Sequence, residues 1–421
     1  MPDFYVPTWQ IDPFTLPPLI RTSEPGSFAH NTLKVRFPGI LRETIALNAF
    51  PKDIGDALEG LYAELTAGAI RGLQEQTPDR GFWDQVSVPY LGRTWLEVPW
   101  YWAEAFFYRR LLEATRYFQP GPMQGFDPFA AKKETEWAPD AAPATIGTVL
   151  ESLPTERAAR FERLLHASLW GNRTDLSYAV AAHLGGTTTP HEERENLLVD
   201  DTAAVWHHLE DPTGRPQRGR PQSGRPQRVA PTRVAIIADN AGTELVMDLA
   251  LSDFLLTEEL AAEVHLHLKP QPFFVSDAMP ADVLTGLRAL ARGEGAVRAL
   301  AGRLGHAIEL GRLRLKAHWS YATSLFFAQM PADLREDLAA CDLVVVKGDA
   351  NYRRLVGDVH WPPITPFAYV TRYFPAPAVA LRTFKAELVV GLQPGEAERL
   401  AALDPDWLVN GRRGVIQAKP A

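Results

Sequence analysis

Acidic and amide residues that could hold a metal ion follow two apolar runs in the C-terminal half of the chain. Asp239 and Asn240 come directly after the run 234–238, and Asp277 follows the run 264–268 by a short Pro-containing link. Carboxylate and amide oxygens are hard ligands that suit Mg²⁺ or Mn²⁺ better than a soft metal. The same residue types also cap helices, so either segment taken alone is explained equally well by a helix N-cap.

Cationic residues follow two further apolar runs. Lys347-Gly348-Asp349-Ala350-Asn351-Tyr352-Arg353 comes after residues 343–346, and Arg382-Thr383-Phe384-Lys385 comes after residues 378–381. The forked guanidinium of arginine matches phosphate oxygens, and lysine adds a point charge. The alternatives are a charged first helical turn for the first segment and simple solvated charge for the second. Acids after two strands and cations after two others together predict a divalent metal beside an anion site.

The order of apolar segments predicts that these four groups meet at one edge of a sheet. Buried strands are expected at 234–238, 264–268, 313–316, 343–346 and 378–381, with helices at 245–256, 283–290 and 297–308 between most of them. Strands alternating with helices specify a parallel sheet covered on both faces, and ligands bind beyond the carboxyl ends of its strands. We therefore predict a Rossmann-like three-layer α/β/α domain.

The first 200 residues show helical rather than strand periodicity. Apolar residues recur at steps of three or four between Leu47 and Leu65 and between residues 156 and 169, and an aromatic-rich helix is expected over 100–112, where the rings pack in the core. We divide the chain into a mainly helical N-terminal domain at 1–210, an insertion at 211–232 and the α/β/α domain at 233–421.

The insertion contains three near-copies of one pentapeptide. Each copy is Gly-Arg-Pro-Gln followed by Arg or Ser, at 214–218, 219–223 and 224–228. Proline and glycine disfavour helix, and no apolar side chain anchors the segment. Its five arginines could tether nucleic acid, but they have no interleaved aromatic residues, so we expect a solvated loop.

Composition limits the class of protein. The chain has 421 residues, 46% hydrophobic and 22% charged, which is typical of a globular protein with a large core. A net charge of -8 argues against nucleic-acid coating, and neither a secretory segment nor a long apolar run is present, so we expect a cytoplasmic protein without membrane or nucleic-acid partners. The single cysteine, Cys341, is expected to be a core thiol, and His267 is interpreted as an interior histidine outside the metal set.

These segments, together with two others, resemble the metal-dependent damage-control phosphatases of the former domain-of-unknown-function family eighty-nine. The subgroup they resemble is that of sugar phosphate phosphatases, which includes acidic residue methyltransferase 1. The other matching segments are Trp170-Gly171-Asn172 with Asp175-Leu176-Ser177, and Leu197 to Asp201; the most specific strings are 348–353 and 382–385. The repeats before the first strand of the sheet are the visible departure from the family pattern.

The resemblance implies the roles of the site residues. Asp239, Asn240 and Asp277 would hold the divalent metal, Mn²⁺ in the first place with Co²⁺, Ni²⁺ or Mg²⁺ as alternatives. The expected phosphate- or substrate-binding residues are Asp349, Asn351, Tyr352, Arg353 and Lys385, the expected catalytic residues are Asp239, Asp277 and Asp349, and the additional candidates are Glu244, Asn172, Asp175 and Arg382.

The predicted activity is hydrolysis of small sugar phosphates of the fructose 1-phosphate or fructose 6-phosphate type. Direct attack by water is favoured over an aspartyl phosphate, because Asp239 is not followed two positions later by a second aspartate. The alternative from another reaction class is S-adenosylmethionine-dependent methylation of protein carboxylates, with Glu244 implicated by the resemblance, although the turn at 239–242 has only one glycine. The third hypothesis is a non-catalytic sugar-phosphate sensor. The predicted metal ligands argue against it, because binding alone does not require an ion that activates water. No oligomeric state is predicted.

Overall fold

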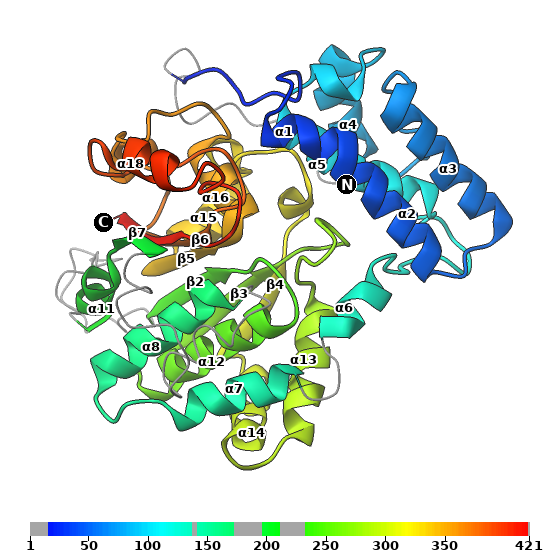
Figure 1. Ribbon diagram of the computed structural model, residues 1–421. Helices are drawn as coiled ribbons and strands as arrows, with labels where there is room; N and C mark the ends of the chain where they lie inside the picture. Colours follow the sequence, from blue (N-terminus) through cyan, green and yellow to red (C-terminus); the bar gives the residue numbers. More distant parts are fainter. Residues whose placement is uncertain (1–15, 137–140, 172–195, 211–231, 420–421) are drawn as a thin grey trace, which may run out of the picture.

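The computed structural model describes residues 16–136, 141–171, 196–210 and 232–419 (Figure 1). The Gly-Arg-Pro-Gln repeats and the candidates Asn172 and Asp175 lie outside these ranges. None of the helices in the described ranges is both long and apolar enough to cross a membrane.

A seven-stranded sheet forms the centre of the molecule, in the order β1-β7-β6-β5-β2-β3-β4. The strands are β1 (Leu197–Asp200), β2 (Arg233–Ile237), β3 (Glu263–Leu268), β4 (Leu313–Ala317), β5 (Leu343–Lys347), β6 (Ala378–Thr383) and β7 (Gly414–Lys419). Neighbours run parallel except β6 and β7, which are antiparallel. The five predicted strands are confirmed to within two residues at each end, whereas β1 and β7 were not predicted.

Strand β2 is the point at which the strand order reverses. β3 and β4 lie on one side of β2, and β5 and β6 lie on the other. In open α/β sheets the carboxyl ends of the strands at such a reversal leave a crevice that no crossover helix covers. The segments that follow β2 and β5 are therefore placed together by the topology.

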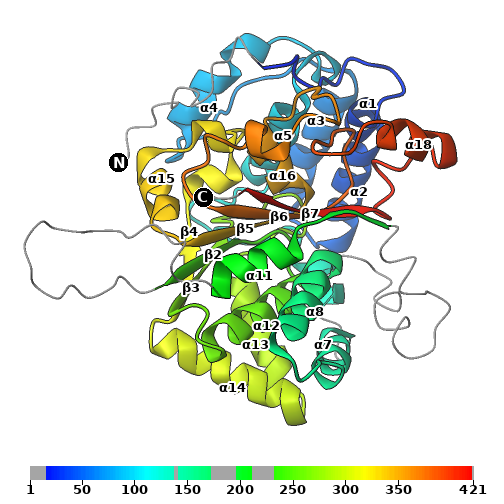
Figure 2. The same ribbon diagram turned by 90° about the vertical axis from the view of Figure 1, so that its left-hand side faces the viewer.

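Helices cover both faces of the sheet, as Figure 2 shows. Along β2, Val234 and Ile236 belong to one apolar cluster, and Ala235 and Ile237 belong to the other. This alternation between two cores is why the parallel strands read as continuous apolar runs. The predicted three-layer α/β/α class is confirmed.

Two groups of helices supply these cores. The helices of one face are α7 (Ala141–Glu151), α8 (Arg157–Trp170), α11 (Thr202–Glu210), α12 (Thr243–Thr257), α13 (Pro280–Arg292) and α14 (Gly295–Glu309). The remaining helices are α1 (Phe28–Asn31), α2 (Phe37–Leu47), α3 (Lys52–Ala67), α4 (Arg80–Ser87), α5 (Trp100–Ala114), α6 (Ala130–Glu136), α15 (Ala332–Ala339), α16 (Gly348–Val356), α17 (Phe367–Val370) and α18 (Glu396–Leu403).

The division of the chain at residue 210 stays a prediction. α7, α8, β1 and α11 all lie within residues 1–210, yet β1 pairs with β7, and α7 and α8 pack against α12. The helices α1 to α5 instead lie together over the opposite face (Figure 2).

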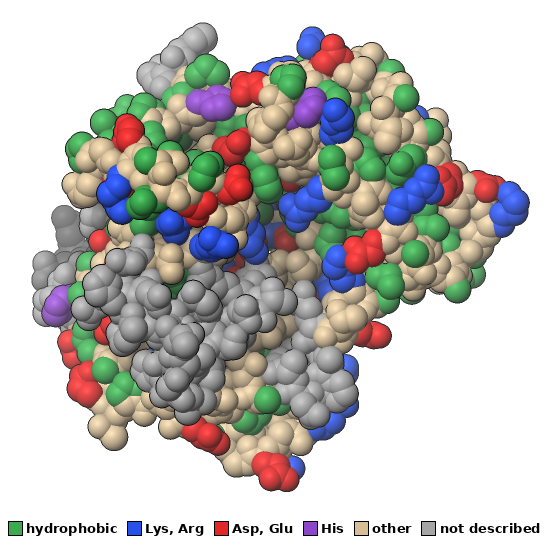
Figure 3. Space-filling model, viewed as in Figure 1, with side chains coloured by type: hydrophobic (Ala, Val, Ile, Leu, Met, Phe, Trp, Pro, Cys, Tyr) green, Lys and Arg blue, Asp and Glu red, His purple; other side chains and the backbone are tan. Residues whose placement is uncertain are grey.

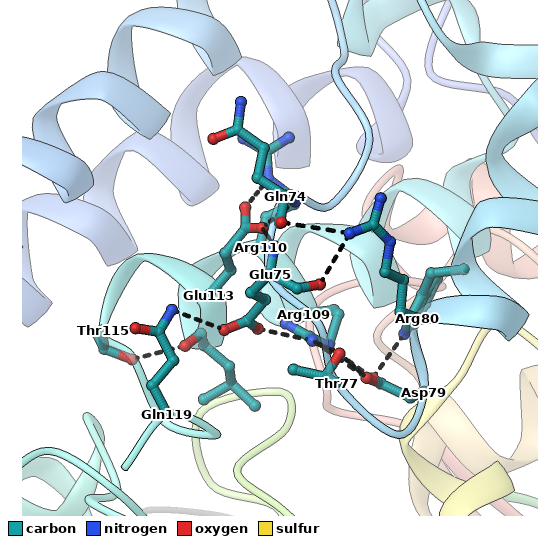
Figure 4. A network of polar contacts seen from close by, with 12 residues as sticks. Gln74, Glu75, Thr77, Asp79, Arg80, Arg109, Arg110, Glu113, Thr115 and Gln119 are labelled. Atoms are coloured by element: carbon teal, nitrogen blue, oxygen red, sulfur yellow. Dashed lines mark hydrogen bonds and ion pairs between the residues drawn. The ribbon is translucent and has the colours of Figure 1, made fainter. Parts of the chain in front are cut away.

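Helix α5 is the buried centre of the N-terminal helices, as its aromatic stripe predicts. Its two arginines are held by carboxylates from the segment around α3 and α4 (Figure 4). Arg109 lies 2.6 Å from Asp79, and Arg110 lies 2.7 Å from Glu64. These ion pairs neutralise charges that would otherwise be costly inside the helical layer. Cys341 is fully buried, as predicted.

Candidate active site

Backbone pairing beyond the strand ends brings the two acidic segments together. Asn240 and Asp277 form an antiparallel bridge, the amide of Ala278 donates to the carbonyl of Asp239 at 2.8 Å, and that of Ala241 donates to Ser276 at 2.7 Å. The segment after β3 is therefore fixed beside the segment after β2.

The side chains of this cluster form one buried network. Asp239, Asn240 and Asp277 are 7%, 8% and 1% exposed. The Asn240 amide donates to Asp239 Oδ2 at 2.8 Å and to Glu244 Oε2 at 2.9 Å, while its Oδ1 accepts from the Ser276 hydroxyl at 2.6 Å. The amide orientation is thus set on both sides, with its oxygen on the side of Ser276.

Gly348 gives the Asp239 carboxylate the space that it occupies. Gly348 has φ +81°, and a Cβ added there would lie 2.0 Å from Asp239 Oδ2. Only glycine combines this backbone conformation with such a close approach. The turn between β5 and α16 is thereby pressed directly against the acid that follows β2.

The cluster carries an excess of buried negative charge. Burial, followed by repulsion from Glu244 and Asp277, raises the pKa of Asp239 well above its ordinary value, while Lys269 and Lys385 act in the opposite direction. Burial also raises the pKa of Asp277, although the Lys269 ammonium lies 3.1 Å from its Oδ2. A bound cation would relieve this repulsion, because it would compensate carboxylates that water cannot solvate.

The donor chemistry of these residues fits a hard divalent ion. Asp239 and Asp277 offer carboxylate oxygens, and Asn240 offers the amide oxygen that faces Ser276. Such all-oxygen sets are typical of Mg²⁺ and Mn²⁺ sites.

A buried lysine supports the cluster from beneath. Lys347, the last residue of β5, lies 3.0 Å from Glu244 and 3.0 Å from Asp248 and also donates to the carbonyl of Ser168. Gly171, at the end of α8, leaves room for this packing, since a Cβ there would lie 2.9 Å from Glu244 Cα. Glu244, an additional candidate from the sequence, is therefore part of the cluster.

The expected phosphate-binding residues fall into two sets. Asp349 accepts hydrogen bonds from Arg382 Nε at 2.8 Å and from the Lys385 amide at 3.1 Å. The Lys385 side chain is partly exposed, and its charge acts on Asp239. Asp349 and Lys385 thus border the acidic cluster, whereas the other nitrogens of Arg382 are bound to the carbonyls of Ala386 and Leu388.

The second set consists of Asn351, Tyr352 and Arg353, which are fully buried and bind partners within the protein. Asn351 donates to the carbonyls of Ala238 and Lys347, which ties the ends of β2 and β5 together. The Tyr352 hydroxyl donates to Gln417 of β7 at 2.8 Å, and burial raises its pKa to about 12.

Arg353 points its guanidinium into the N-terminal helices. It lies 2.7 Å from Asp358 and 2.5 Å from Glu104, and stacks 3.6 Å above the Trp100 ring. Substrate contact by Asn351, Tyr352 and Arg353 stays a prediction.

Two lysines belong to the site but were not predicted as site residues from the sequence. Lys269 contacts Asp277 and lies 3.4 Å from the Asn351 side chain, and Lys347 neutralises Glu244. Each stands at the end of a buried strand, and a cation in that position is the signal that could have revealed them.

The face drawn in Figure 3 is hollowed near its centre, with Lys and Arg side chains gathered beside the hollow.

The fold and this cluster define an α/β protein with buried carboxylates, an amide and cations at the carboxyl edge of a mostly parallel sheet. The family model of the damage-control phosphatase ARMT1-like domain matches residues 32–400. The chain belongs to this family, which confirms the resemblance read from the sequence.

Curated relatives match over nearly the whole length. Damage-control phosphatase ARMT1 of Danio rerio is 32% identical, with 93% of this chain and 94% of that protein covered. The Homo sapiens protein of the same name is 31% identical, with 96% and 98% covered. A solved DUF89 family protein from Pyrococcus horikoshii aligns at 14% identity with a TM-score of 0.48 over 93% of this chain and 98% of its own.

Proposed function

We propose that this chain is a metal-dependent phosphatase that hydrolyses phosphate monoesters of small sugars, of the fructose 1-phosphate or fructose 6-phosphate type, in metabolite damage control. Membership of the damage-control phosphatase family supports the reaction class. The observation that carries the site assignment is the convergence of Asp239, Asn240 and Asp277 through the bridge between the segments after β2 and β3.

In this proposal Asp239, Asn240 and Asp277 hold the divalent ion, with Mn²⁺ preferred. The ion, when bound, supplies a Lewis acid beside the phosphoryl group. Lys385 is suited to offset phosphate charge, because its side chain borders the cluster and is partly exposed.

Asp349 is proposed to orient either the attacking water or the sugar oxygen. It is held by Arg382 and by the backbone of Lys385, so its position is fixed before substrate arrives. In the hydrolysis the water oxygen bonds to phosphorus, the bond from phosphorus to the sugar oxygen breaks, and the proton that the water gives up ends on the sugar oxygen.

The test is phosphate release from fructose 1-phosphate by chelator-stripped protein, with and without added Mn²⁺. Release that depends on Mn²⁺ and is lost in Asp239→Asn and Asp277→Asn supports both the activity and the site. Asp253→Asn is the matched control, because this acid is also buried on α12 but pairs with Arg303 away from the cluster. It should keep full turnover.

Two results would contradict the proposal. Full turnover of Asp239→Asn at saturating Mn²⁺ would overturn the metal assignment. Absence of release across a panel of sugar phosphates would overturn the substrate class, and S-adenosylmethionine binding would then be measured to test carboxyl methylation.

A further inference from the structure

Two histidines on β3 lie on the face of the sheet opposite Val264 and Leu266. His265 and His267 are 1% and 2% exposed, and they alternate along the strand with the apolar residues of the other core. The proposed phosphatase site uses neither of them.

Each ring has one nitrogen held by a protein partner and one without. His265 Nε2 lies 3.0 Å from the Glu263 carboxylate, and His267 Nδ1 lies 2.9 Å from the Tyr321 hydroxyl. The remaining nitrogens, His265 Nδ1 and His267 Nε2, are buried and have no hydrogen-bond partner among the described residues. Metal-binding histidines characteristically show this division, with one nitrogen oriented by a carboxylate or hydroxyl and the other left as ligand.

Asp337 of α15 faces the unpartnered nitrogen of His267. Its Oδ2 lies 3.8 Å from His267 Nε2, while its Oδ1 is held by Lys316. One candidate ligand atom from each of His265, His267 and Asp337 lies within 4.8 Å of the others. The Asp337 side chain is 27% exposed, so it can move the short distance that bonds of about 2.0–2.2 Å to one ion require.

A cavity of about 420 Å³ reaches two of the three groups, His267 and Asp337. It is lined by His267, Lys316, His318, Asp333 and Asp337 among others. The cavity gives an ion a path from solvent and leaves space for a water or small anion as a further ligand.

We propose that His265, His267 and Asp337 form a second divalent-metal site, which binds a zinc-type ion and shares no residue with the Asp239–Asp277 cluster. Two imidazole nitrogens and one carboxylate are the donor set of Zn²⁺, Co²⁺ and Ni²⁺ rather than of Mg²⁺. The two metal sites therefore differ in ligand chemistry, with oxygen donors at the strand ends and mainly nitrogen donors on β3.

The experiment uses the full chain carrying Asp239→Asn and Asp277→Asn, so that the strand-end cluster does not contribute. Zn²⁺ binding is measured by titration calorimetry, and Co²⁺ binding by its visible absorption. The expected result is one equivalent of bound ion, lost on addition of His267→Gln or Asp337→Asn. Because Asp337 is partly exposed, its variant keeps the test valid if the buried histidine variant fails to fold.

Two further variants separate a metal site from a merely structural cluster. Tyr321→Phe removes only the group that orients His267, and should weaken Zn²⁺ binding about 10- to 100-fold. His318→Gln is the matched control and should bind normally, because both nitrogens of His318 already have partners, Ser320 and Asp333. Absence of a bound equivalent in the Asp239→Asn/Asp277→Asn chain, or equal affinity after Asp337→Asn, would overturn the proposal. Either result is independent of phosphatase activity.

Discussion

Replacing Gly348 with alanine tests the contact on which the candidate active site is built. The added Cβ would lie 2.0 Å from Asp239 Oδ2, and carbon atoms of this kind do not approach within 3.0 Å, so the carboxylate must move by about 1 Å or more. A misplacement of that size at a reacting centre can cost roughly 100-fold in rate. We therefore expect Gly348→Ala to lose about two orders of magnitude in Mn²⁺-dependent turnover.

The backbone supplies a second and separable cost. Gly348 has φ +81°, and a left-handed conformation costs a non-glycine residue roughly 1–2 kcal/mol of stability. Gly357, at the other end of α16, has φ +95° and nothing within 4 Å of its added Cβ. Gly357→Ala is therefore the matched control, which carries the backbone cost without the contact with Asp239.

The assay compares both variants in urea unfolding and in phosphate release at saturating Mn²⁺. Both should lose stability through the backbone conformation, Gly348→Ala by more because of its added contact, and only Gly348→Ala should lose turnover. Turnover of Gly348→Ala within about twofold of the Gly357→Ala value would refute the reasoning, since it would show that displacing the Asp239 carboxylate does not affect the reaction.

Three further predictions concern stability and the insertion. Lys347→Met leaves two buried carboxylates without their cation and should lower the free energy of unfolding by about 3–5 kcal/mol, whereas Lys52→Met, at an exposed ion pair, should leave the urea midpoint nearly unchanged. Partial burial raises the pKa of Asp200, but hydrogen bonds from His166 and Thr202 outweigh it and lower the pKa to about 2. The ionised Asp200 therefore stabilises the folded state above about pH 4, and this stabilisation is lost as the pH falls toward 2. The urea midpoints of wild type and Asp200→Asn should differ at pH 6 and converge toward pH 2. A difference that stays constant with pH would contradict this prediction. Deletion of residues 214–228 should leave turnover nearly unchanged, and a large loss would show that the insertion shapes the site.

The local sequence pattern was sufficient to predict most strands of the sheet, because the parallel strands are buried on both faces. The runs at 234–238 and 343–346 are apolar for that reason, and their order along the chain fixes which edge carries Asp239 and Gly348. β1 and β7 lacked this signal. β1 is only four residues long and partly exposed, and β7 contains glycine, glutamine and lysine and runs antiparallel.

The surroundings of individual side chains depended on segments distant in sequence. Phosphate contact by Arg353 stays a prediction, and its partner within the protein, Glu104, is 249 residues away in the chain. The facing of His267 and Asp337 is equally absent from any local pattern, because α15 is laid over β3 only in the folded chain.

The sequence by itself determined the α/β alternation, the family and the acids at the ends of two neighbouring strands, because periodic burial and strand order are written in consecutive residues. Only the tertiary structure decided which cation pairs with which carboxylate, and which histidine nitrogens have no hydrogen-bond partner among the described residues. Those outcomes depend on the packing of helices against the sheet, where a buried charge or ring takes whichever partner the fold brings within a few ångströms.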